Sequence, residues 1–361
     1  MAASKATNDI PVLIVGAGPT GLTAALKLAK HRVPVRLVEK RTTPSPLSRA
    51  VGLLPRSMAI FESLGVAEQI RHEALEVEAI EVYRGDRPIG HIRMSSHPDP
   101  TVRILCLPQD RTESILAEAL STHGVTAEYG TTFEGLEQAA TVSATVSGER
   151  RRYAAVLGCD GSRSTVRSAI GLLADGYDLE EEWSIADLYI PDWSDYRFRI
   201  SIMDSGEMTL IVPMQPGRYR LVTTEPDALL ANPIPLPDYT VRRTGSFKIS
   251  VRQVPEYGVG RVWLAGDAAH THSPVGGRGM NLGIADANDW ADRYVADTLE
   301  GYSGARHAVG ARTIQFTEQM RKLLQESSPL KRAALMLLVR SVSLARFMHP
   351  RIAEQIVAGE F

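Results

Sequence analysis

The chain has 361 residues, of which 44% are hydrophobic and 23% are charged, and its formal net charge is -2. This is the composition of an ordinary globular protein with enough residues for two lobes. A near-neutral charge argues against a nucleic-acid-binding role, which favours a basic patch or stripe. The two cysteines, Cys106 and Cys159, are too few for a disulfide framework.

Neither end of the chain indicates a membrane segment. Residues 1–8 lack the apolar core of a secretory signal. The longest apolar run near the C-terminus covers residues 333–339, far short of the ~20 residues that span a bilayer. Together with the two thiols, these features predict a cytoplasmic protein without membrane insertion. The sequence does not indicate an oligomeric state.

The first 39 residues predict a βαβ unit. Residues 11–15 are a continuous apolar run, as expected for a strand that is covered on both faces. Residues 22–31 are rich in good helix formers, and residues 34–39 indicate a second strand. Such units have right-handed crossovers and build parallel sheets.

A glycine motif, Gly16-x-Gly18-x-x-Gly21, separates the first strand from the helix. Gly16 allows a tight turn, Gly18 lets the backbone approach a pyrophosphate closely, and Gly21 lets the helix pack on the strand. The helix N-terminus offers N–H groups and a partial positive charge to phosphates. Glu39, at the end of the second strand, can accept hydrogen bonds from ribose hydroxyls. The motif predicts a dinucleotide site but does not separate FAD from NAD.

The middle of the chain changes character twice. Residues 79–94 alternate between apolar and polar side chains, which predicts antiparallel strands, and residues 112–123 predict a helix. Residues 175–257 contain short alternating runs and many prolines, which predict a mostly antiparallel lobe. Residues 261–265 return to a buried-strand pattern. From residue 279 onward the chain is expected to be helical, with breaks near residues 301–304 and at Pro329.

A second motif follows the strand at residues 261–265 and favours FAD over NAD. An aspartate after a buried strand, here Asp267, can hold a ribose or ribityl hydroxyl. A glycine-rich turn from Pro274 to Asn281 then opens a long helix. The N-terminus of that helix can face the negative charge that develops on the N1–C2=O edge of a reduced flavin. Its glycines let a planar ring lie close to the backbone.

These segments resemble the class A flavin monooxygenases, the family of para-hydroxybenzoate hydroxylase. The resemblance covers residues 16–39, 49–52, 109–113, 160–167 and 266–286, in the order of the family. It implies an α/β fold, with a Rossmann-like FAD-binding domain of the GR2 type, an inserted mostly antiparallel β substrate lobe and C-terminal helices. The expected divisions are an FAD-binding domain in two parts (1–174 and 258–300), the inserted lobe (175–257) and C-terminal helices (301–361).

The resemblance also implies residue roles. Glu39 would hold the adenosine ribose, and Arg49 and Gln109 would contact the phosphate and ribityl regions of FAD. Asp160 belongs to a second fingerprint associated with FAD and NAD(P)H, and Asp267 would hold the ribityl chain. Pro274 and residues 277–281 would line the isoalloxazine. The expected cofactor-binding residues are Gly16, Gly18, Pro19, Thr20, Gly21, Glu39, Lys40, Arg49, Gln109, Asp160, Asp267, Pro274, Gly277, Gly279, Met280 and Asn281.

The chemistry that the resemblance implies is aromatic hydroxylation. NAD(P)H reduces FAD, the reduced flavin reacts with O2 to form a C4a-hydroperoxide, and its distal oxygen is transferred to an aromatic or polyketide-like small molecule. The protein binds and orients the reactants and keeps water out. No catalytic base and no metal site can be assigned. A related flavin reductase, a halogenase, a drug-inactivating monooxygenase and a non-catalytic flavin sensor remain alternatives.

Some side chains allow two interpretations. His270 is more simply structural than catalytic, and the role of His272 stays open. Cationic residues flank the apolar run at residues 333–339, which favours docking on the core or on a second subunit over a membrane-surface helix. Four aromatic residues of the inserted lobe could form a substrate pocket or simple core: Trp183, Trp193, Tyr196 and Phe198.

Overall fold

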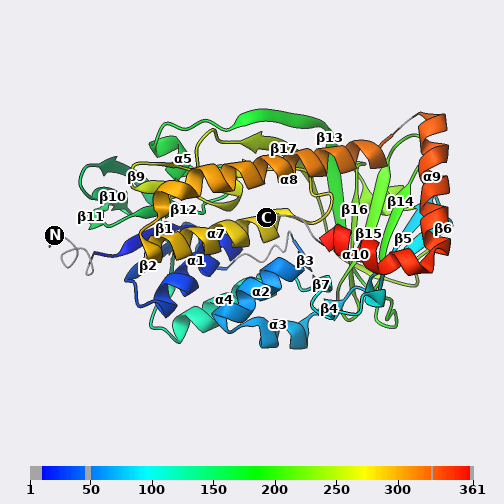
Figure 1. The fold of residues 1–361 in the computed structure, drawn as a ribbon, viewed down its shortest axis with the longest axis horizontal. Coiled ribbons are helices and arrows are strands. Elements are labelled where there is room, and N and C mark those ends of the chain that lie inside the picture. Colours follow the sequence, from blue (N-terminus) through cyan, green and yellow to red (C-terminus); the bar gives the residue numbers. More distant parts are fainter. Residues whose placement is uncertain (1–9, 45–49, 327, 358–361) are drawn as a thin grey trace.

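The computed structural model describes residues 10–44, 50–326 and 328–357, and it has two lobes that lie end to end (Figure 1). One lobe contains a six-stranded sheet in which only β18 is antiparallel to its neighbour. In spatial order its strands are β18 (Gly258–Val259), β19 (Val262–Leu264), β12 (Val156–Gly158), β1 (Val12–Val15), β2 (Val35–Glu39) and β8 (Ala127–Tyr129).

The predicted βαβ unit is confirmed at the centre of this sheet. All four residues of β1 are buried, as a strand between two covered faces requires. The helix α1 (Pro19–Lys30) packs against α7 (Gly279–Ala296) and α4 (Gln109–Ser121). Two small sheets complete the lobe, with strands β3 (Gly52–Leu53), β7 (Leu105–Cys106) and β4 (Leu75–Glu76), and β9 (Phe133–Gln138), β10 (Val142–Val146) and β11 (Glu149–Tyr153).

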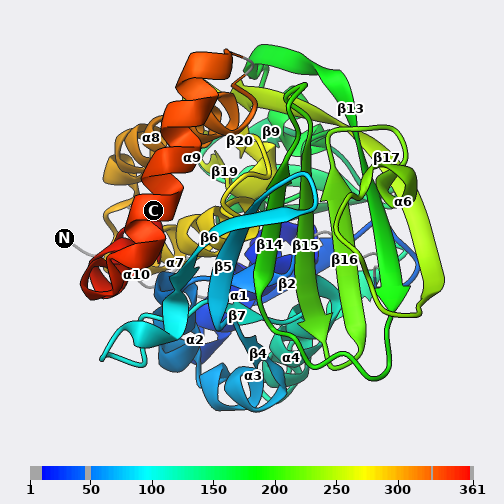
Figure 2. The ribbon, with the colours of Figure 1, turned by 90° about the vertical axis from the view of Figure 1, so that its right-hand side faces the viewer.

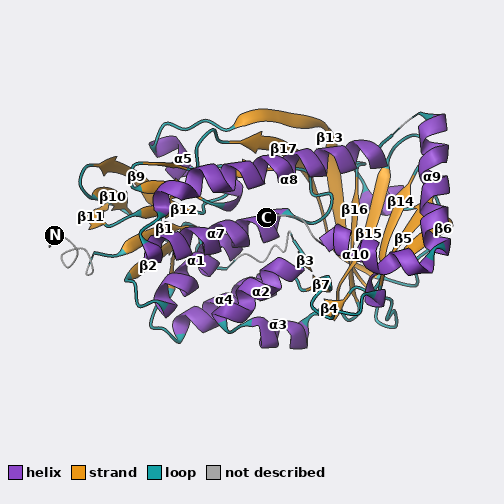
Figure 3. Ribbon diagram, viewed as in Figure 1, coloured by secondary structure: helices purple, strands orange, loops and turns teal. Residues whose placement is uncertain are grey.

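The other lobe is built on an eight-stranded sheet (Figure 3). Its strands are antiparallel except for the parallel pair β14 and β5. In spatial order they are β20 (His270–Thr271), β17 (Thr240–Gln253), β13 (Asp175–Tyr189), β16 (Arg218–Thr223), β15 (Met208–Gln215), β14 (Phe198–Ile202), β5 (Ala79–Arg84) and β6 (Arg87–Arg93).

Strands from outside residues 175–257 therefore belong to this sheet. The hairpin of β5 and β6 joins it at one edge, and β20 joins it at the other. The eight-stranded sheet therefore extends beyond residues 175–257. The expected domain boundaries at residues 174 and 257 stay a prediction.

Helices connect and cover the two lobes. The remaining α-helices are α2 (Pro55–Leu64), α3 (Ala67–Glu73), α5 (Thr165–Ala169), α6 (Ala228–Ala231), α8 (Tyr302–Leu324), α9 (Pro329–Leu344) and α10 (His349–Val357). The long helix α8 runs beside β13 and β17 from one lobe to the other (Figure 1). Figure 2 faces the eight-stranded sheet, with α9 and α10 along one edge, where both contact β6.

The two faces of the eight-stranded sheet have different neighbours. On β13, alternate residues such as Trp183 and Asp187 define the inner face. Trp183 shares a hydrophobic cluster with Val275 and with Ile314 of α8. The intervening residues define the outer face, where Ala186 packs in a cluster that includes Ala228 of α6. Only the inner face is therefore directed at the glycine-rich turn of the parallel-sheet lobe.

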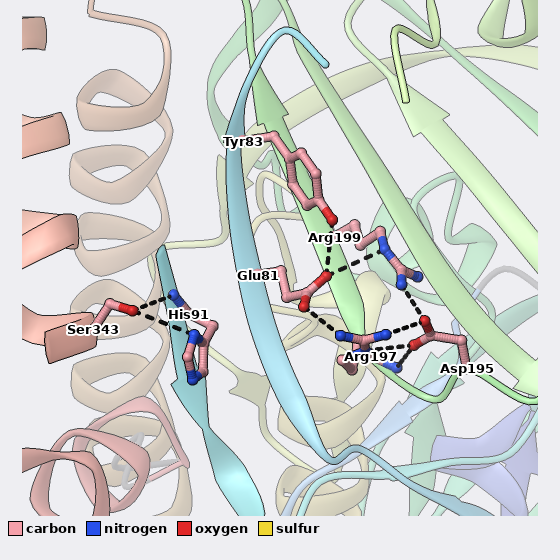
Figure 4. Close-up of polar contacts among 7 residues, drawn as sticks. All are labelled: Glu81, Tyr83, His91, Asp195, Arg197, Arg199 and Ser343. Atoms are coloured by element: carbon pink, nitrogen blue, oxygen red, sulfur yellow. Dashed lines mark hydrogen bonds and ion pairs between the residues drawn. The ribbon is translucent and has the colours of Figure 1, made fainter. Parts of the chain in front are cut away.

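The outer face carries an ion-pair network that ties β5 to β14 (Figure 4). Arg197 donates to Glu81 over 2.6 Å and also pairs with Asp195. Arg199, on β14, pairs with the same two carboxylates and lies 4.9 Å from the centre of the Trp193 ring. Trp193 and Trp183 therefore lie on opposite faces of the sheet, so the four aromatic residues do not form one pocket.

The inner face carries one buried ion pair. Asp187 of β13 and Arg220 of β16 stand opposite each other in register, with Nε and Nη2 of the arginine 2.6 and 2.8 Å from the two carboxylate oxygens. Both residues are buried, at 8% and 2% exposure. Bidentate geometry makes such a pair directional as well as strong.

We expect Asp187→Ala to lower the free energy of unfolding by about 3–5 kcal/mol, because it leaves a buried guanidinium without its carboxylate. The double variant Asp187→Leu with Arg220→Met should recover most of that loss, since it removes both charges. Urea unfolding of the three proteins measures this. Equal destabilisation by the single and double variants would show that packing, and not the uncompensated charge, carries the effect.

Candidate active site

The first glycine turn lies at the carboxyl end of β1. Gly16 has a φ of +106°, and a Cβ there would lie 2.4 Å from the carbonyl oxygen of Cys159. A Cβ at Gly21 would lie 1.9 Å from the carbonyl oxygen of Gly16. Gly18 differs, because no described atom lies within 4 Å of a Cβ placed there. Gly16 and Gly21 thus serve the packing of the turn, and Gly18 faces open space at the start of α1.

Glu39 reaches this turn from the end of β2. Its carboxylate accepts a hydrogen bond from the Ala17 N–H over 3.0 Å and from the Arg41 N–H over 2.9 Å, and it also pairs with the Arg41 side chain. Burial alone would raise the pKa of Glu39, but the hydrogen bonds and charge of Arg41 hold it below its ordinary value. The side chain is ionised and fixed beside the turn. Lys40, the next residue, is exposed.

The second glycine turn lies beside the first. Asp267 is exposed within a short 3-10 turn, Gly266–Ala268. Gly276 and Gly277 both have positive φ, at +83° and +62°, and no described atom lies within 4 Å of a Cβ placed at Gly277. The first N–H groups of α7 have no partners within the helix, and they follow this turn directly. Like the first turn, the second one combines an open glycine with a helix N-terminus.

Thr20 brings the two turns together. A Cβ at Gly266 would lie 2.7 Å from the Thr20 Oγ1, and a Cβ at Gly283 would lie 2.4 Å from the same atom. The Thr20 hydroxyl on α1 therefore fits into the space left by the missing side chains of Gly266 and Gly283. Pro19 and Thr20 were both expected to bind the cofactor. Pro19 is buried, and the side chain of Thr20 contacts α7 instead of facing open space.

Asn281 joins the second turn to the start of α2. Its Nδ2 donates to the carbonyl oxygens of Gly52 and Gly277, each over 2.9 Å. Its Oδ1 accepts from the Leu54 N–H over 2.9 Å and from the Ser57 hydroxyl over 2.7 Å. The amide is fully used by the protein, so Asn281 shapes the turn. Its neighbours Gly279 and Met280 are half-buried.

Other expected residues are placed less directly. Gln109 accepts from the Ala50 N–H over 3.1 Å and thereby anchors the chain that follows Arg49. Arg49 itself lies outside the described residues. Asp160 accepts from the Ser164 hydroxyl over 2.5 Å and from two N–H groups at the start of α5. Pro274 is exposed. Their roles toward a cofactor stay predictions.

A buried charge network lies behind Asp267, and the sequence analysis did not identify it. Asp286 of α7 is fully buried and accepts from the Gly266 N–H over 3.0 Å. His270 Nε2 and Arg306 Nε each donate to its carboxylate over 2.6 Å. Burial alone would raise the pKa of Asp286, but Arg306 and His270 hold it below its ordinary value. His270 is buried and bonded to Asp286, and its interpretation as a structural residue stays a prediction.

His272 precedes α7 in the chain, and its ring lies beside Gly279 at the start of that helix. Its Nδ1 donates to the Ser273 carbonyl oxygen over 2.8 Å, and its Nε2 is buried without a partner among the described residues. Burial lowers the pKa of His272 to about 4, so the ring is neutral at neutral pH and presents a hydrogen-bond acceptor. A Cβ at Gly279 would lie 3.9 Å from this atom. The buried acceptor is suited to a ligand donor at the second turn.

Together, the two turns suit an extended ligand with a phosphate part and a ring part. Helix N-termini with open glycines bind phosphates and other negative charge. The family described as FAD binding domain matches this chain over residues 9–227 and 230–317. A 6-methylpretetramide 4-monooxygenase of Streptomyces rimosus is 30% identical, over 96% of this chain and 68% of that protein.

This chain belongs to the family of FAD-dependent monooxygenases. A 3-hydroxybenzoate 4-monooxygenase of Comamonas testosteroni is 27% identical over 88% of the chain and 60% of that protein. The crystal structure of a p-nitrophenol 4-monooxygenase of Pseudomonas putida superposes with a TM-score of 0.87 at 26% identity, over 98% of this chain and 99% of that one. These relatives support a monooxygenase over a reductase, a halogenase or a sensor.

The geometry of the two glycine turns is compatible with the family that the comparisons show. No described atom lies within 4 Å of a Cβ placed at Gly18 or Gly277, and the N-termini of α1 and α7 lie next to these two glycines. No described helix has the length and apolar composition needed to cross a membrane. No group of three metal-binding side chains occurs within residues 10–44, 50–326 and 328–357.

We expect Asp286→Asn to lower the free energy of unfolding by about 3–5 kcal/mol, because Arg306 then remains buried without a negative partner. The variant should also bind FAD more weakly, since the acceptor for Gly266 loses its charge. The matched control is Asp289→Asn in the same helix, where the ion pair with Arg293 is partly exposed. The Asp289→Asn control should lower the free energy of unfolding by less than about 1 kcal/mol.

Urea unfolding and FAD titration measure both variants. Equal losses in the two proteins would contradict a special role for the buried charge.

Proposed function

We propose that this monooxygenase inserts one oxygen atom of O2 into an aromatic or polyketide-like small molecule, with NAD(P)H as the electron donor. The observation that carries this proposal is the contact of Thr20 with Gly266 and Gly283, which holds α1 against α7. Gly18 and Gly277 are open positions that precede these two packed helices. A single extended FAD would bind with its diphosphate at the first opening and its ring at the second.

The residue roles follow from this placement. Glu39 is ionised and fixed beside the first turn, which suits a ribose hydroxyl as donor. The N–H groups at the start of α1 and α7 would hold the diphosphate and the pyrimidine edge of the flavin. Asp267 would hold the ribityl chain, and His272 would accept a hydrogen bond from the ligand. FAD supplies the oxygen activation when it is bound.

The protein itself must orient the substrate and exclude water. The inner face of the eight-stranded sheet is suited to this, because it shares a cluster with Val275 in the second turn. Several of its apolar side chains are only half-buried, including Ile185, Leu210 and Val222. The buried pair of Asp187 and Arg220 lies in their midst. Flat apolar ligands with a few polar groups match such a surface.

The relatives support the substrate class. Their names describe action on 6-methylpretetramide and on 3-hydroxybenzoate, and both imply aromatic substrates. We further place the enzyme in the cytoplasm, a location that the two free thiols of Cys106 and Cys159 support.

We expect Asp267→Ala to purify largely without flavin, because it removes the carboxylate assigned to the ribityl hydroxyls. Asp238→Ala, in an exposed loop of the other lobe, is the matched control and should keep the full complement. The ratio of flavin absorbance to protein absorbance in the purified protein measures how much flavin each variant retains. Full retention in Asp267→Ala would remove this residue from the site.

The reaction is tested with a panel of phenolic and polyketide-like compounds under 18O2. A substrate should accelerate NAD(P)H consumption and gain one labelled oxygen atom, which mass spectrometry detects. Flavin reduction without labelled product for every compound would contradict the proposed oxygenation and favour a reductase or a sensor.

A further inference from the structure

Helix α9 is fixed to the edge of the eight-stranded sheet by one of its faces. A Cβ at Gly90 of β6 would lie 2.8 Å from the Ser343 Cβ and 3.0 Å from the Val339 carbonyl oxygen, so helix and strand approach without an intervening side chain. The Ser343 hydroxyl accepts from the His91 N–H over 3.1 Å (Figure 4). Met336 on the same face is buried. This contact sets which side of α9 points away from the protein.

The opposite side of α9 exposes a row of apolar side chains, where a solvated helix is polar, and the exposed Arg340 lies beside this row. Leu330, Leu337 and Leu344 are spaced by seven residues and are 81%, 66% and 78% exposed. Ala334 and Ser341 lie between them on the same face. We call these five residues the α9 stripe. Leu338 and Phe347 beside it are 60% and 82% exposed. Contiguous exposed apolar side chains of this kind mark an interaction surface.

We propose that the α9 stripe docks on the α9 stripe of a second copy of this chain, with the two helices antiparallel about a two-fold axis at Leu337. Leucines at a seven-residue spacing favour a helix as the partner. In this arrangement Leu337 meets its own counterpart, and Leu330 meets Leu344 of the second copy. The small side chains of Ala334 and Ser341 let the helix backbones approach closely. The interface is isologous, so it closes at two copies.

Charges at the ends of α9 are complementary in this arrangement. Arg346 lies just beyond Leu344, and Glu326 lies just before Leu330, where it also contacts Lys331. An antiparallel pairing brings Arg346 of one copy toward Glu326 of the other at both ends. Antiparallel helix dipoles add a favourable term. A lipid surface would use the exposed cations Lys331, Arg340 and Arg346. It offers no cationic partner to Glu326 beyond Lys331, so the second copy is the better match.

The size of the stripe bounds the affinity. A helix of 16 residues is about 24 Å long and roughly 10 Å wide. Such a footprint falls below the roughly 800 Å² per partner of a standard stable interface. We therefore expect a dimer that dissociates on dilution, with a dissociation constant on the order of micromolar.

Sedimentation velocity of the flavin-loaded enzyme over a dilution series tests the proposal. Leu337→Asp should raise the dissociation constant at least tenfold, by about the effect of 1.4 kcal/mol, because it places two like charges at the axis. Leu230→Asp is the matched control, since Leu230 is 87% exposed on α6, outside the stripe. It should leave the dissociation constant unchanged. Flavin absorbance and unfolding confirm that each variant is folded.

A charge exchange tests the orientation. Arg346→Glu should weaken the dimer, and the double variant Arg346→Glu with Glu326→Arg should restore it. A monomer at every concentration overturns the proposal. So does a dimer that Leu337→Asp leaves intact. Sedimentation of the monomer with vesicles of anionic phospholipid, lost in Leu337→Asp, would instead assign the stripe to a membrane surface. None of these outcomes depends on the proposed reaction.

Discussion

The site depends on contacts between backbone segments that leave no room for side chains. Gly21 approaches the carbonyl oxygen of Gly16, and the Thr20 hydroxyl occupies the space beside Gly266 and Gly283. These contacts hold α1 against β1 on one side and against α7 on the other. Because the packed glycines keep the two turns adjacent, Gly18 and Gly277 can remain open. An added methyl group at a packed glycine meets backbone or buried atoms, which cannot shift cheaply.

A buried charge extends this constraint to the second lobe. Asp286 accepts from the Gly266 N–H and pairs with Arg306 of α8. The same helix places Ile314 in the cluster on the inner face of the eight-stranded sheet. The turn assigned to the ribityl chain and the surface assigned to the substrate are therefore attached to one rigid element. Displacement of α8 would cost buried hydrogen bonds at one end and apolar contacts at the other.

Local patterns predicted the backbone of the first glycine turn. Gly16 makes the tight turn and Gly21 lets the helix pack closely, as expected, and Gly18 is open, while its approach to a pyrophosphate stays a prediction. Glu39 could be placed because it ends a strand that is parallel to β1. In contrast, Arg306 could not be found, since it meets Asp286 only after α7 and α8 fold back on each other. Its signal in the sequence is one arginine in an amphipathic helix, which ordinarily indicates a solvated face.

Strand pairing was equally hard to anticipate. Residues 79–94 were recognised as antiparallel strands, yet alternation does not say which sheet they join. They pair with β14, more than a hundred residues later. The sequence could not show whether the four aromatic residues form one pocket, for a related reason. Trp183 and Trp193 lie ten residues apart, but β13 ends between them and the chain turns to the other face.

The inner face of the eight-stranded sheet combines parts of unequal tolerance to substitution. The p-nitrophenol monooxygenase keeps this backbone at 26% identity, so relatives with this fold differ mainly in side chains. Ile185, Leu210 and Val222 are half-buried, and replacing such residues costs less than replacing fully packed ones. Asp187 and Arg220 are buried together, so neither can change alone without stranding a charge. Under the proposed function, a change of substrate would proceed through the half-buried apolar residues while the ion pair stays unchanged. That route keeps the sheet stable while it reshapes the surface next to the second glycine turn.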